Sequence, residues 1–252
     1  MILSVKRPAL TMLVLVTCSV LAVGCGGTGA TTATNSGDVS AGTPLTRASA
    51  TAYAHAVNLR AADVPEMSGA GSAEGEPPQT PSSQRSSSAF SRCFGGVSAN
   101  ARLVKIHSPE FSVGRAAQSQ IVRSTVEVWP TAALAVRNNA AYFSSRGQRC
   151  FLRYLQAARL QLKRRAAKLQ LGPLRVATVA APLPGTTDGR LRTIDDTRNG
   201  HVRIHIYHDI FTFIIGPAEI ELEATGFSKP IPTATEERLL SLLLKRAKAS
   251  TL

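Results

Sequence analysis

Acidic and aromatic residues are both scarce in this chain. It has 16 acidic residues against 29 lysines and arginines, a formal net charge of +13, and aromatic residues make up only 5% of it. No acidic residue lies between Glu127 and Asp188, whereas ten basic residues fall between Arg137 and Arg175. A basic surplus concentrated in one stretch favours a partner with an anionic surface.

The common catalytic signatures are also missing. No serine sits in a Gly-x-Ser-x-Gly elbow, no Ser-x-x-Lys motif occurs in a suitable context, and no glycine-rich loop is placed to hold a phosphate. Cys93 and Cys150 have no histidine cluster near them, which argues against a zinc site. The sequence therefore predicts a protein that has no metal or other cofactor and is not an enzyme.

The N-terminus has the three parts of a secretory signal. Lys6 and Arg7 form a basic start, an apolar run covers 9–23, and small residues lead up to Cys25. The apolar run is only about 15 residues long, whereas a transmembrane helix needs roughly 20. We therefore predict that residues 1–24 are a signal peptide that is removed on export.

Residues 21–25, Leu-Ala-Val-Gly-Cys, resemble the lipobox of bacterial lipoproteins, although Ala22 stands where leucine is usual. The resemblance implies that Cys25 is acylated, with palmitate or a related chain, and becomes the first residue of the mature protein. The alternatives are an ordinary cleaved signal followed by a chance cysteine, and an uncleaved membrane anchor. Residues 25–49 are mostly Gly, Thr, Ala and Ser, which predicts a flexible tether. We expect a lipid-anchored protein on the extracytoplasmic face of the cell membrane.

The remaining residues, 50–252, are enough for one domain with a core of its own. Cys18 lies in the signal and Cys25 takes the lipid, which leaves Cys93 and Cys150 as an even pair. In an oxidising compartment such a pair is expected to form a disulfide. The alternative is two unpaired, buried thiols.

Periodicity predicts an α+β fold, an antiparallel sheet of about five to six strands packed against a long basic helix and a C-terminal helix. Residues 51–62 favour a short strand, though their alanines leave a helix possible, and 67–88 are predicted to be a mobile loop. Alternation over 120–128 predicts a strand with one buried face. Further predicted elements are a helix over 131–170 with Gly147 as a candidate break, and strands over 174–181, 190–197, 202–207, 210–215 and 220–224. Asn199-Gly200 predicts a hairpin turn, and Thr233 with Glu236 predicts a capping box at the start of a final helix.

The long helix separates apolar from basic residues. Phe151, Leu155, Ala158 and Leu162 recur at helical spacing and form one stripe. The opposite side carries Arg146, Arg149, Arg153, Lys163 and Arg164. The favoured interpretation is a core helix with a solvated basic face. The alternative is a face that contacts anionic lipid or a cell-wall polymer, because exported proteins do not meet nucleic acid where they work.

His201 and His205 share one face of a predicted strand, and Glu219, Glu221 and Glu223 share one face of another. Histidine and carboxylate ligands from neighbouring strands can converge on a metal. The favoured interpretation is instead an exposed face on which Arg203 pairs with these glutamates. Asp195 and Asp196 point to opposite faces of their strand and cannot act as a carboxylate pair.

The mature domain also resembles a known group. Asn58-Leu59-Arg60 precedes Asp63-Val64-Pro65, Cys93 is followed by Gly95-Gly96, and Ser108-Pro109-Glu110-Phe111 comes before the strand and the long Ala/Arg helix. This order is similar to that of actinobacterial exported lipoproteins and sensor-type domains of the LpqN and PknH extracellular-domain group. The resemblance covers about residues 50–250 and implies a PsbP-like α/β sandwich with a binding or accessory role at the cell envelope. It supplies no active-site residues.

Three functions follow, in order of preference. The first is an envelope-anchored lipoprotein whose non-catalytic domain binds a ligand or partner, which would be a lipid, a wall polymer or another envelope protein. The second is an envelope scaffold protein that uses the basic helix face. The third is a metal-assisted enzyme at His201 and His205. A deep apolar pocket between the sheet and the helices would favour the first.

Overall fold

The central strands follow directly from the alternation in the sequence. The computed structural model describes residues 44–69, 89–90, 92–115, 118–165, 169–179, 189–199 and 201–252. β4 (Gln120–Val128) and β8 (Ala218–Phe227) pair antiparallel along their whole length, from Val128 opposite Ala218 to Gln120 opposite Gly226. Successive side chains of a strand point to opposite faces. Both sets are largely buried, so β4 has two buried faces and not the one that was predicted.

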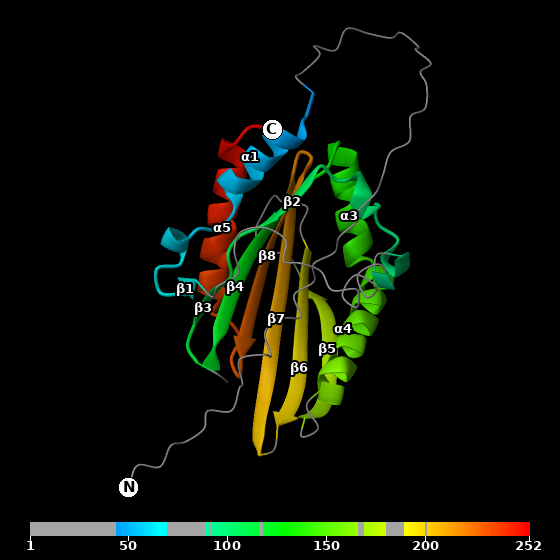
Figure 1. Ribbon diagram of the computed structural model, residues 1–252, viewed down its shortest axis with the longest axis vertical. Helices are drawn as coiled ribbons and strands as arrows, with labels where there is room; N and C mark the ends of the chain where they lie inside the picture. The colour runs from blue at the N-terminus through cyan, green and yellow to red at the C-terminus, as the bar shows by residue number, and fades with distance from the viewer. Residues whose placement is uncertain are drawn as a thin grey trace.

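β4 and β8 lie inside an antiparallel sheet of eight strands (Figure 1). β2 (Val104–His107) and β3 (Phe111–Val113) pair with the two halves of one edge of β4. The remaining strands are β1 (Ser68–Gly69) beside β3 and, on the other side of β8 in this order, β7 (Val202–Ile215), β6 (Gly189–Asn199) and β5 (Leu169–Val179). The predicted α+β class with an antiparallel sheet is confirmed. The sheet is larger than expected because three short strands, β1 to β3, join its edge.

Two helices, α1 (Arg47–Val57) and α5 (Thr233–Ala249), cover one face of the sheet and fill the space beneath them (Figure 1). Val122, Ile220 and Leu222 of the sheet are fully buried, as is Leu243 of α5. Cutting such a leucine back to alanine typically costs about 2–5 kcal/mol. This half of the protein is therefore an ordinary closed core.

The short strand that was favoured for 51–62 is wrong, because residues 51–57 belong to α1. The buried positions of the helix are Ala50, Tyr53, Ala54 and Val57, which recur at helical spacing. A strand would bury His55 together with Tyr53, but His55 is exposed. The Thr46 side chain accepts a hydrogen bond from the Ser49 amide and caps the helix. The helix begins at Arg47, within the segment 25–49 that was predicted to be a tether.

The opposite face of the sheet carries α3 (Ala132–Phe143) and α4 (Ser145–Arg165) (Figure 1). The single predicted helix over 131–170 is thus two helices, and the break falls at Ser144, whose backbone is extended. The Ser144 hydroxyl accepts from the Gly147 amide at 3.0 Å and so caps the start of α4. A Cβ at Gly147 would lie 2.3 Å from the Tyr142 carbonyl oxygen, so glycine permits this close approach. Leu169 already belongs to β5, and the helical part ends earlier than predicted.

Two smaller expectations also change. Met67 is buried, and Ser68 and Gly69 pair with β3, so the first residues of the predicted mobile loop are part of the fold. The final helix begins at Thr233 with Pro232 as its N-cap and no capping side chain, so the predicted capping box does not form. Two short 3-10 helices are η1 (Ala61–Asp63) and η2 (Ala99–Ala101), and residues 92–94 around Cys93 are also helical.

The predicted signal peptide (1–24), Cys25 and the tether as far as residue 43 lie outside the described residues, as do positions 70–88 of the predicted loop. In the part of the chain that is described, no helix is both long enough and apolar enough to cross a bilayer.

Candidate functional site

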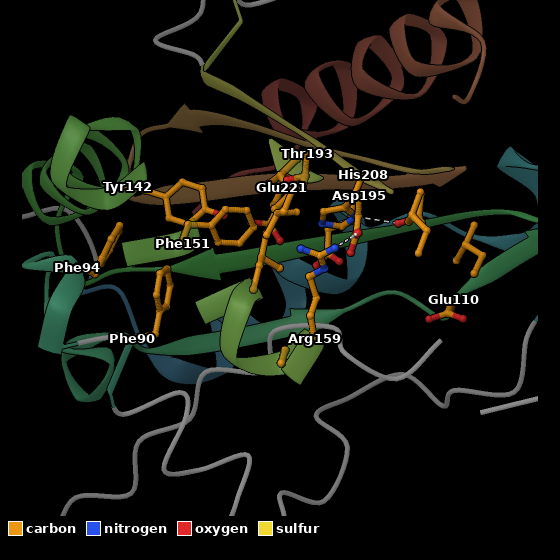
Figure 2. A pocket seen from close by; sticks show the side chains of 18 of the residues that line it. Phe90, Phe94, Glu110, Tyr142, Phe151, Arg159, Thr193, Asp195, His208 and Glu221 are labelled. Atoms are coloured by element: carbon orange, nitrogen blue, oxygen red, sulfur yellow. Dashed lines mark hydrogen bonds and ion pairs between the residues drawn. The ribbon is translucent and has the colours of Figure 1, made fainter. Parts of the chain in front are cut away.

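A pocket of about 260 Å³ lies on the face of the sheet that α3 and α4 cover (Figure 2). Its roof includes the apolar stripe that was predicted on the long helix, Phe151, Leu155, Ala158 and Leu162. The floor is formed by residues of six strands, β2 and β4 to β8. The stripe does face inward, as predicted, but what it faces is a cavity rather than a filled core.

Aromatic side chains form one end of the pocket. Phe90 and Phe94 stack with their ring centres 5.6 Å apart, and Tyr142 meets Phe94 edge to face at 5.4 Å. Phe151 of α4 contacts both Phe90 and Tyr142. These side chains come from the segment around Cys93, from α3 and from α4, and Figure 2 shows them together at one end. We refer to Phe90, Phe94, Tyr142 and Phe151 as the aromatic wall.

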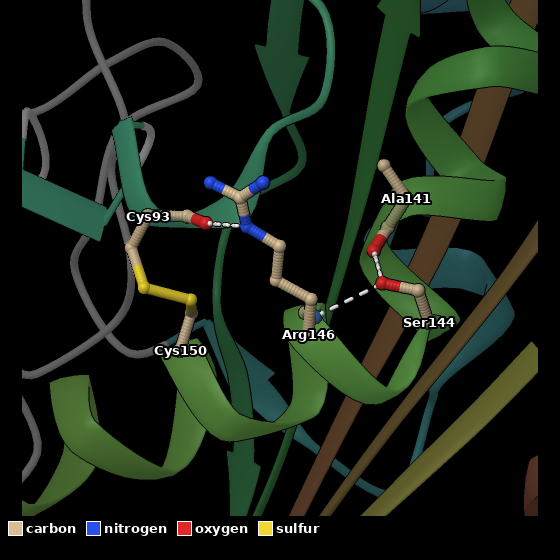
Figure 3. The surroundings of a disulfide bond; sticks show 6 residues. Cys93, Ala141, Ser144, Arg146 and Cys150 are labelled. Atoms are coloured by element: carbon tan, nitrogen blue, oxygen red, sulfur yellow. Dashed lines mark hydrogen bonds between the residues drawn. A yellow bond between two sulfur atoms is a disulfide. The ribbon is translucent and has the colours of Figure 1, made fainter.

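A disulfide holds the aromatic wall together (Figure 3). Cys93 and Cys150 are bonded, with their Cα atoms 5.8 Å apart, as the cysteine count predicted. The Arg146 side chain adds a second link, because its Nε donates to the Cys93 carbonyl oxygen at 2.8 Å. Gly95 follows with a φ of +75°, a conformation that suits glycine. The segment that carries Phe94 is thus fixed to the first turns of α4.

The floor of the pocket is acidic. Glu219, Glu221 and Glu223 alternate along β8 and all line the cavity, so the exposed row that was favoured for them is wrong. Arg203 does not pair with them but with Asp196 on the other face of the sheet, at 3.1 Å. The pattern along β8 was correct, but the strand is covered on both sides.

Two of the floor carboxylates are ion-paired. Arg123 Nη2 lies 2.6 Å from Glu223 Oε1, across the strand pair of β4 and β8. Glu127 is held by Lys105 at 2.7 Å and by Arg102 at 3.1 Å. Burial alone would raise the pKa of either carboxyl, but the neighbouring cations prevail and lower the pKa of Glu127 and of Glu223 to about 2.

The other two lack a cation. Among the described residues, no lysine or arginine is ion-paired with Glu219 or Glu221. Glu219 accepts hydrogen bonds from Asn138 Nδ2 at 2.9 Å and from Trp129 Nε1 at 3.3 Å, and burial, together with the charge of Glu127, raises its pKa to about 7. Burial and the charge of Glu223 raise the pKa of Glu221 well above its usual range. Both carboxyl groups are thus easily protonated.

Further polar groups lie under α4. Arg159 reaches down from the helix to Asp195 of β6 at 2.7 Å (Figure 2). Thr193, on the same strand, is 4% exposed, and its hydroxyl has no hydrogen-bond partner. His208 Nδ1 lies 2.7 Å from Thr225 Oγ1, and burial lowers the pKa of this histidine, so that its ring is neutral.

The alternative metal site is contradicted by the register of the sheet. Glu221 is opposite Thr212 on β7, so the β7 side chains that share its face have even numbers. His201 and His205 have odd numbers and lie on the other face, where His205 is paired with Asp196. No cluster of three or more potential metal ligands occurs among the described residues. Asp195 and Asp196 do point to opposite faces, as predicted.

The basic residues of α4 lie outside the pocket. The side chains that were singled out on the far side of the helix are exposed, namely Arg146, Arg149, Arg153, Lys163 and Arg164. Arg146 is partly engaged through the Cys93 carbonyl. Whether this face contacts an anionic surface stays a prediction. Cys25, the predicted lipidation site, lies outside the described residues.

Neither a scan against protein-family models nor a search of curated proteins finds a match. Among solved structures, the chain is similar to the extracellular domain of PknH from Mycobacterium tuberculosis, with a TM-score of 0.42 and 14% identity over 82% of this chain and 98% of that chain. This is one of the two proteins that the sequence resemblance named. The relation to LpqN and the lipid anchor stay predictions, and the function is argued from this chain's own pocket.

Proposed function

We propose that this protein is a non-catalytic ligand-binding domain, held by an acyl chain at Cys25 on the extracytoplasmic face of the cell membrane. The observation that carries the proposal is the pocket of about 260 Å³ under α4. Protein interiors contain few voids larger than one water molecule, and this one has room for about nine. An apolar wall with a few convergent polar groups is typical of small-molecule sites.

The contrast between the two sides of the sheet supports this reading. Under α1 and α5 the same sheet carries a closed core of Val, Ile, Leu and Phe. Under α4 the roof is partly small, with Ala158 over the cavity, and the floor is charged. Hydrophobic residues there would stabilise the fold at least as well as ion pairs do, so stability alone does not account for the arrangement.

Binding rather than catalysis is proposed because of the groups present. In the described part of the chain, the pocket lining includes no serine or cysteine, and its lysine, Lys105, is paired with Glu127. Arg159 and Asp195 are also engaged with each other. These contacts shape and polarise a binding site without presenting an activated nucleophile.

A pocket-filling variant tests the proposal. Ala158 lines the cavity, whereas its neighbour Ala157 is exposed on the same helix, so Ala157→Trp is a matched control for Ala158→Trp. We expect the neutral apolar probe phenylbutanol to bind the wild-type protein in calorimetry, and Ala158→Trp to weaken that binding by about tenfold or more because an indole fills much of the cavity. Equal binding by both variants and the wild type, with unchanged melting temperatures, would refute the pocket as the site.

The anchor is tested separately. Intact-mass analysis of protein from bacterial membranes is expected to show a chain that begins at Cys25 and carries acyl groups. Cys25→Ser is expected to release the protein from the membrane fraction, because a cysteine thiol is the acylated group. A chain that retains Met1, or membrane association that survives the substitution, would contradict anchoring at this residue.

The exposed basic face of α4 favours a second candidate, an envelope scaffold that contacts anionic lipid or a wall polymer. Each basic side chain near an anionic membrane contributes up to about 1 kcal/mol. Changing Arg149, Arg153, Lys163 and Arg164 to Gln should therefore lower binding of the unacylated protein to phosphatidylglycerol vesicles by at least about tenfold. The matched control changes four exposed cations elsewhere, Arg47, Lys229, Lys245 and Lys248. Equal losses in both variants would mean that the α4 face has no special role.

A further inference from the structure

The charge of the pocket is opposite to that of the chain. The protein carries a formal net charge of +13, yet its pocket is lined by six carboxylates and only three cations. The carboxylates are Glu110, Glu127, Asp195, Glu219, Glu221 and Glu223, and the cations are Arg102, Lys105 and Arg159. An acidic interior in a basic protein has to be explained by something other than overall composition.

The ion pairs account for three of these six carboxylates, and Glu219 and Glu221 stand apart from them on β8. Glu127 takes both Arg102 and Lys105, Asp195 takes Arg159, and Glu223 takes Arg123 from beside the cavity. Glu219 and Glu221 are the next positions along the same face of β8. Glu219 accepts hydrogen bonds from Asn138 and Trp129, and burial and the charge of Glu223 raise the pKa of Glu221.

The aromatic wall stands beside this unpaired end. Asn138, which donates to Glu219, lies one helical turn before Tyr142, and residues four apart share a helix face. Both residues line the cavity. Rings attract a cation through their negative faces, so carboxylates next to an aromatic wall suit an ammonium group better than any neutral group.

A second, separate feature points to a bound molecule. The Thr193 hydroxyl lines the cavity on β6, is 4% exposed and has no hydrogen-bond partner. A buried hydroxyl without a partner costs about 1–3 kcal/mol, so such groups are nearly always satisfied by water or a ligand. Thr193 is level with Thr225 of β8 across β7, four residues along the strand from Glu221, so its hydroxyl lies in the part of the cavity away from Glu219 and Glu221.

We propose that the pocket takes a small amine with an apolar body, its ammonium group held by Glu219 and Glu221 beside the aromatic wall. The apolar body lies under Leu155, Ala158 and Leu162 of α4. The inference rests on the proposed ligand-binding function and names the chemical class of the ligand. Its size is about ten non-hydrogen atoms, from the volume that each such atom occupies.

Protonation gives this site a recognisable signature. Since the pKa of Glu219 is raised to about 7 and that of Glu221 is raised as well, the empty site holds protons near neutral pH. An ammonium group requires the ionised carboxylates, so its binding releases protons into the buffer. Affinity for an amine therefore rises with pH through neutrality, while the amine itself, with an ordinary pKa of about 10, stays charged.

The experiment compares three probes of one shape, phenylbutylamine, phenylbutanol and phenylbutyrate, by calorimetry at about pH 7.5. We expect the amine to bind about ten- to a hundredfold more tightly than the alcohol, the range for a hydrogen bond to a charged partner, and the butyrate to bind least. Glu221→Gln and Glu219→Gln should each lower amine affinity by about tenfold or more and leave the alcohol unchanged. Glu237→Gln, on the exposed face of α5, is the control and should change neither.

The outcomes separate the two claims. If the alcohol binds as tightly as the amine, or if Glu221→Gln and Glu219→Gln both retain amine affinity, the amine inference is overturned while ligand binding stands. If no probe binds, or if Ala158→Trp binds all three like the wild type, the proposed function itself fails. Proton release that varies with the ionisation enthalpy of the buffer, and disappears in the double Gln variant, supports the site. Circular dichroism confirms that each variant is folded.

Discussion

Arg123 is the residue whose loss should reveal most about the acidic floor. Its guanidinium lies 2.6 Å from Glu223, and the two residues are only 6% and 7% exposed. Arg123→Met leaves a buried, unpaired carboxylate beside Glu221. Breaking a buried pair from one side costs about 3–5 kcal/mol. The lowered pKa of Glu223, about 2 against an ordinary 4.5, independently corresponds to about 3 kcal/mol of stabilisation.

Urea unfolding followed by circular dichroism measures this change. At neutral pH we expect Arg123→Met to lower the free energy of unfolding by about 3–5 kcal/mol. The double variant Arg123→Met/Glu223→Met removes the orphaned charge as well, and hydrophobic replacement of a buried pair is often neutral or stabilising. It should therefore recover to within about 1 kcal/mol of the wild type.

The same pair predicts a pH dependence. Because the folded-state pKa of Glu223 lies below its unfolded value, the stabilisation is present above about pH 4.5 and is lost as the pH falls towards about 2. The gap between the wild type and Arg123→Met should narrow over that range. The reasoning is refuted if Arg123→Met unfolds within about 1 kcal/mol of the wild type at neutral pH, or if the double variant is as unstable as the single one.

Three further predictions concern stability, each measured by urea unfolding. Glu219→Gln should match the wild type near pH 4 and exceed it by up to about 3 kcal/mol near pH 9, because a raised pKa of about 7 means that ionisation above neutrality destabilises the folded state; a constant difference would contradict this. Ser124→Ala removes the hydroxyl that accepts from the Leu59 amide at 2.9 Å and should cost about 2 kcal/mol, whereas a loss below about 0.5 kcal/mol would mean that water replaces it. The double variant Cys93→Ser/Cys150→Ser opens a link across 57 residues and should cost about 4 kcal/mol, and reductant should then have no further effect.

The sheet could be predicted from the sequence wherever alternation is strong. β4 and β8 alternate apolar with polar residues and were found close to their predicted ranges, whereas the strands predicted over 202–207 and 210–215 form one continuous strand, β7. α1 was missed because five of its eleven residues are alanines, one at every second position, so the helical period does not stand out. β2 and β3 are short, and their partner lies along the chain beyond the turn at Gly114, so local pattern carried little signal.

The disulfide could be predicted because that prediction needs only the number of cysteines and an oxidising compartment. The acidic floor was not, although the alternation of Glu219, Glu221 and Glu223 was plain in the sequence. Alternation shows that three side chains share a face but not what covers that face. The answer depends on contacts between distant parts of the chain, such as Arg123 with Glu223, which are 100 residues apart. Three glutamates that alternate with apolar residues in a strand nevertheless indicate that the face carrying the glutamates can be buried as well.

The two proposed partners would contact opposite faces of α4. Its inner face presents Leu155 and Ala158 to a pocket whose spare charge is negative, and its outer face presents exposed cations such as Arg149 and Arg153. A positive ligand and a negative surface would therefore contact the same helix without competing for the same side chains. Changes confined to the outer face should leave amine affinity unaltered at high salt, where exposed charges are screened within about 3 Å. The ion pair between an amine and the buried carboxylates is screened far less. If a salt concentration abolishes vesicle binding while amine binding persists, the helix carries two independent sites.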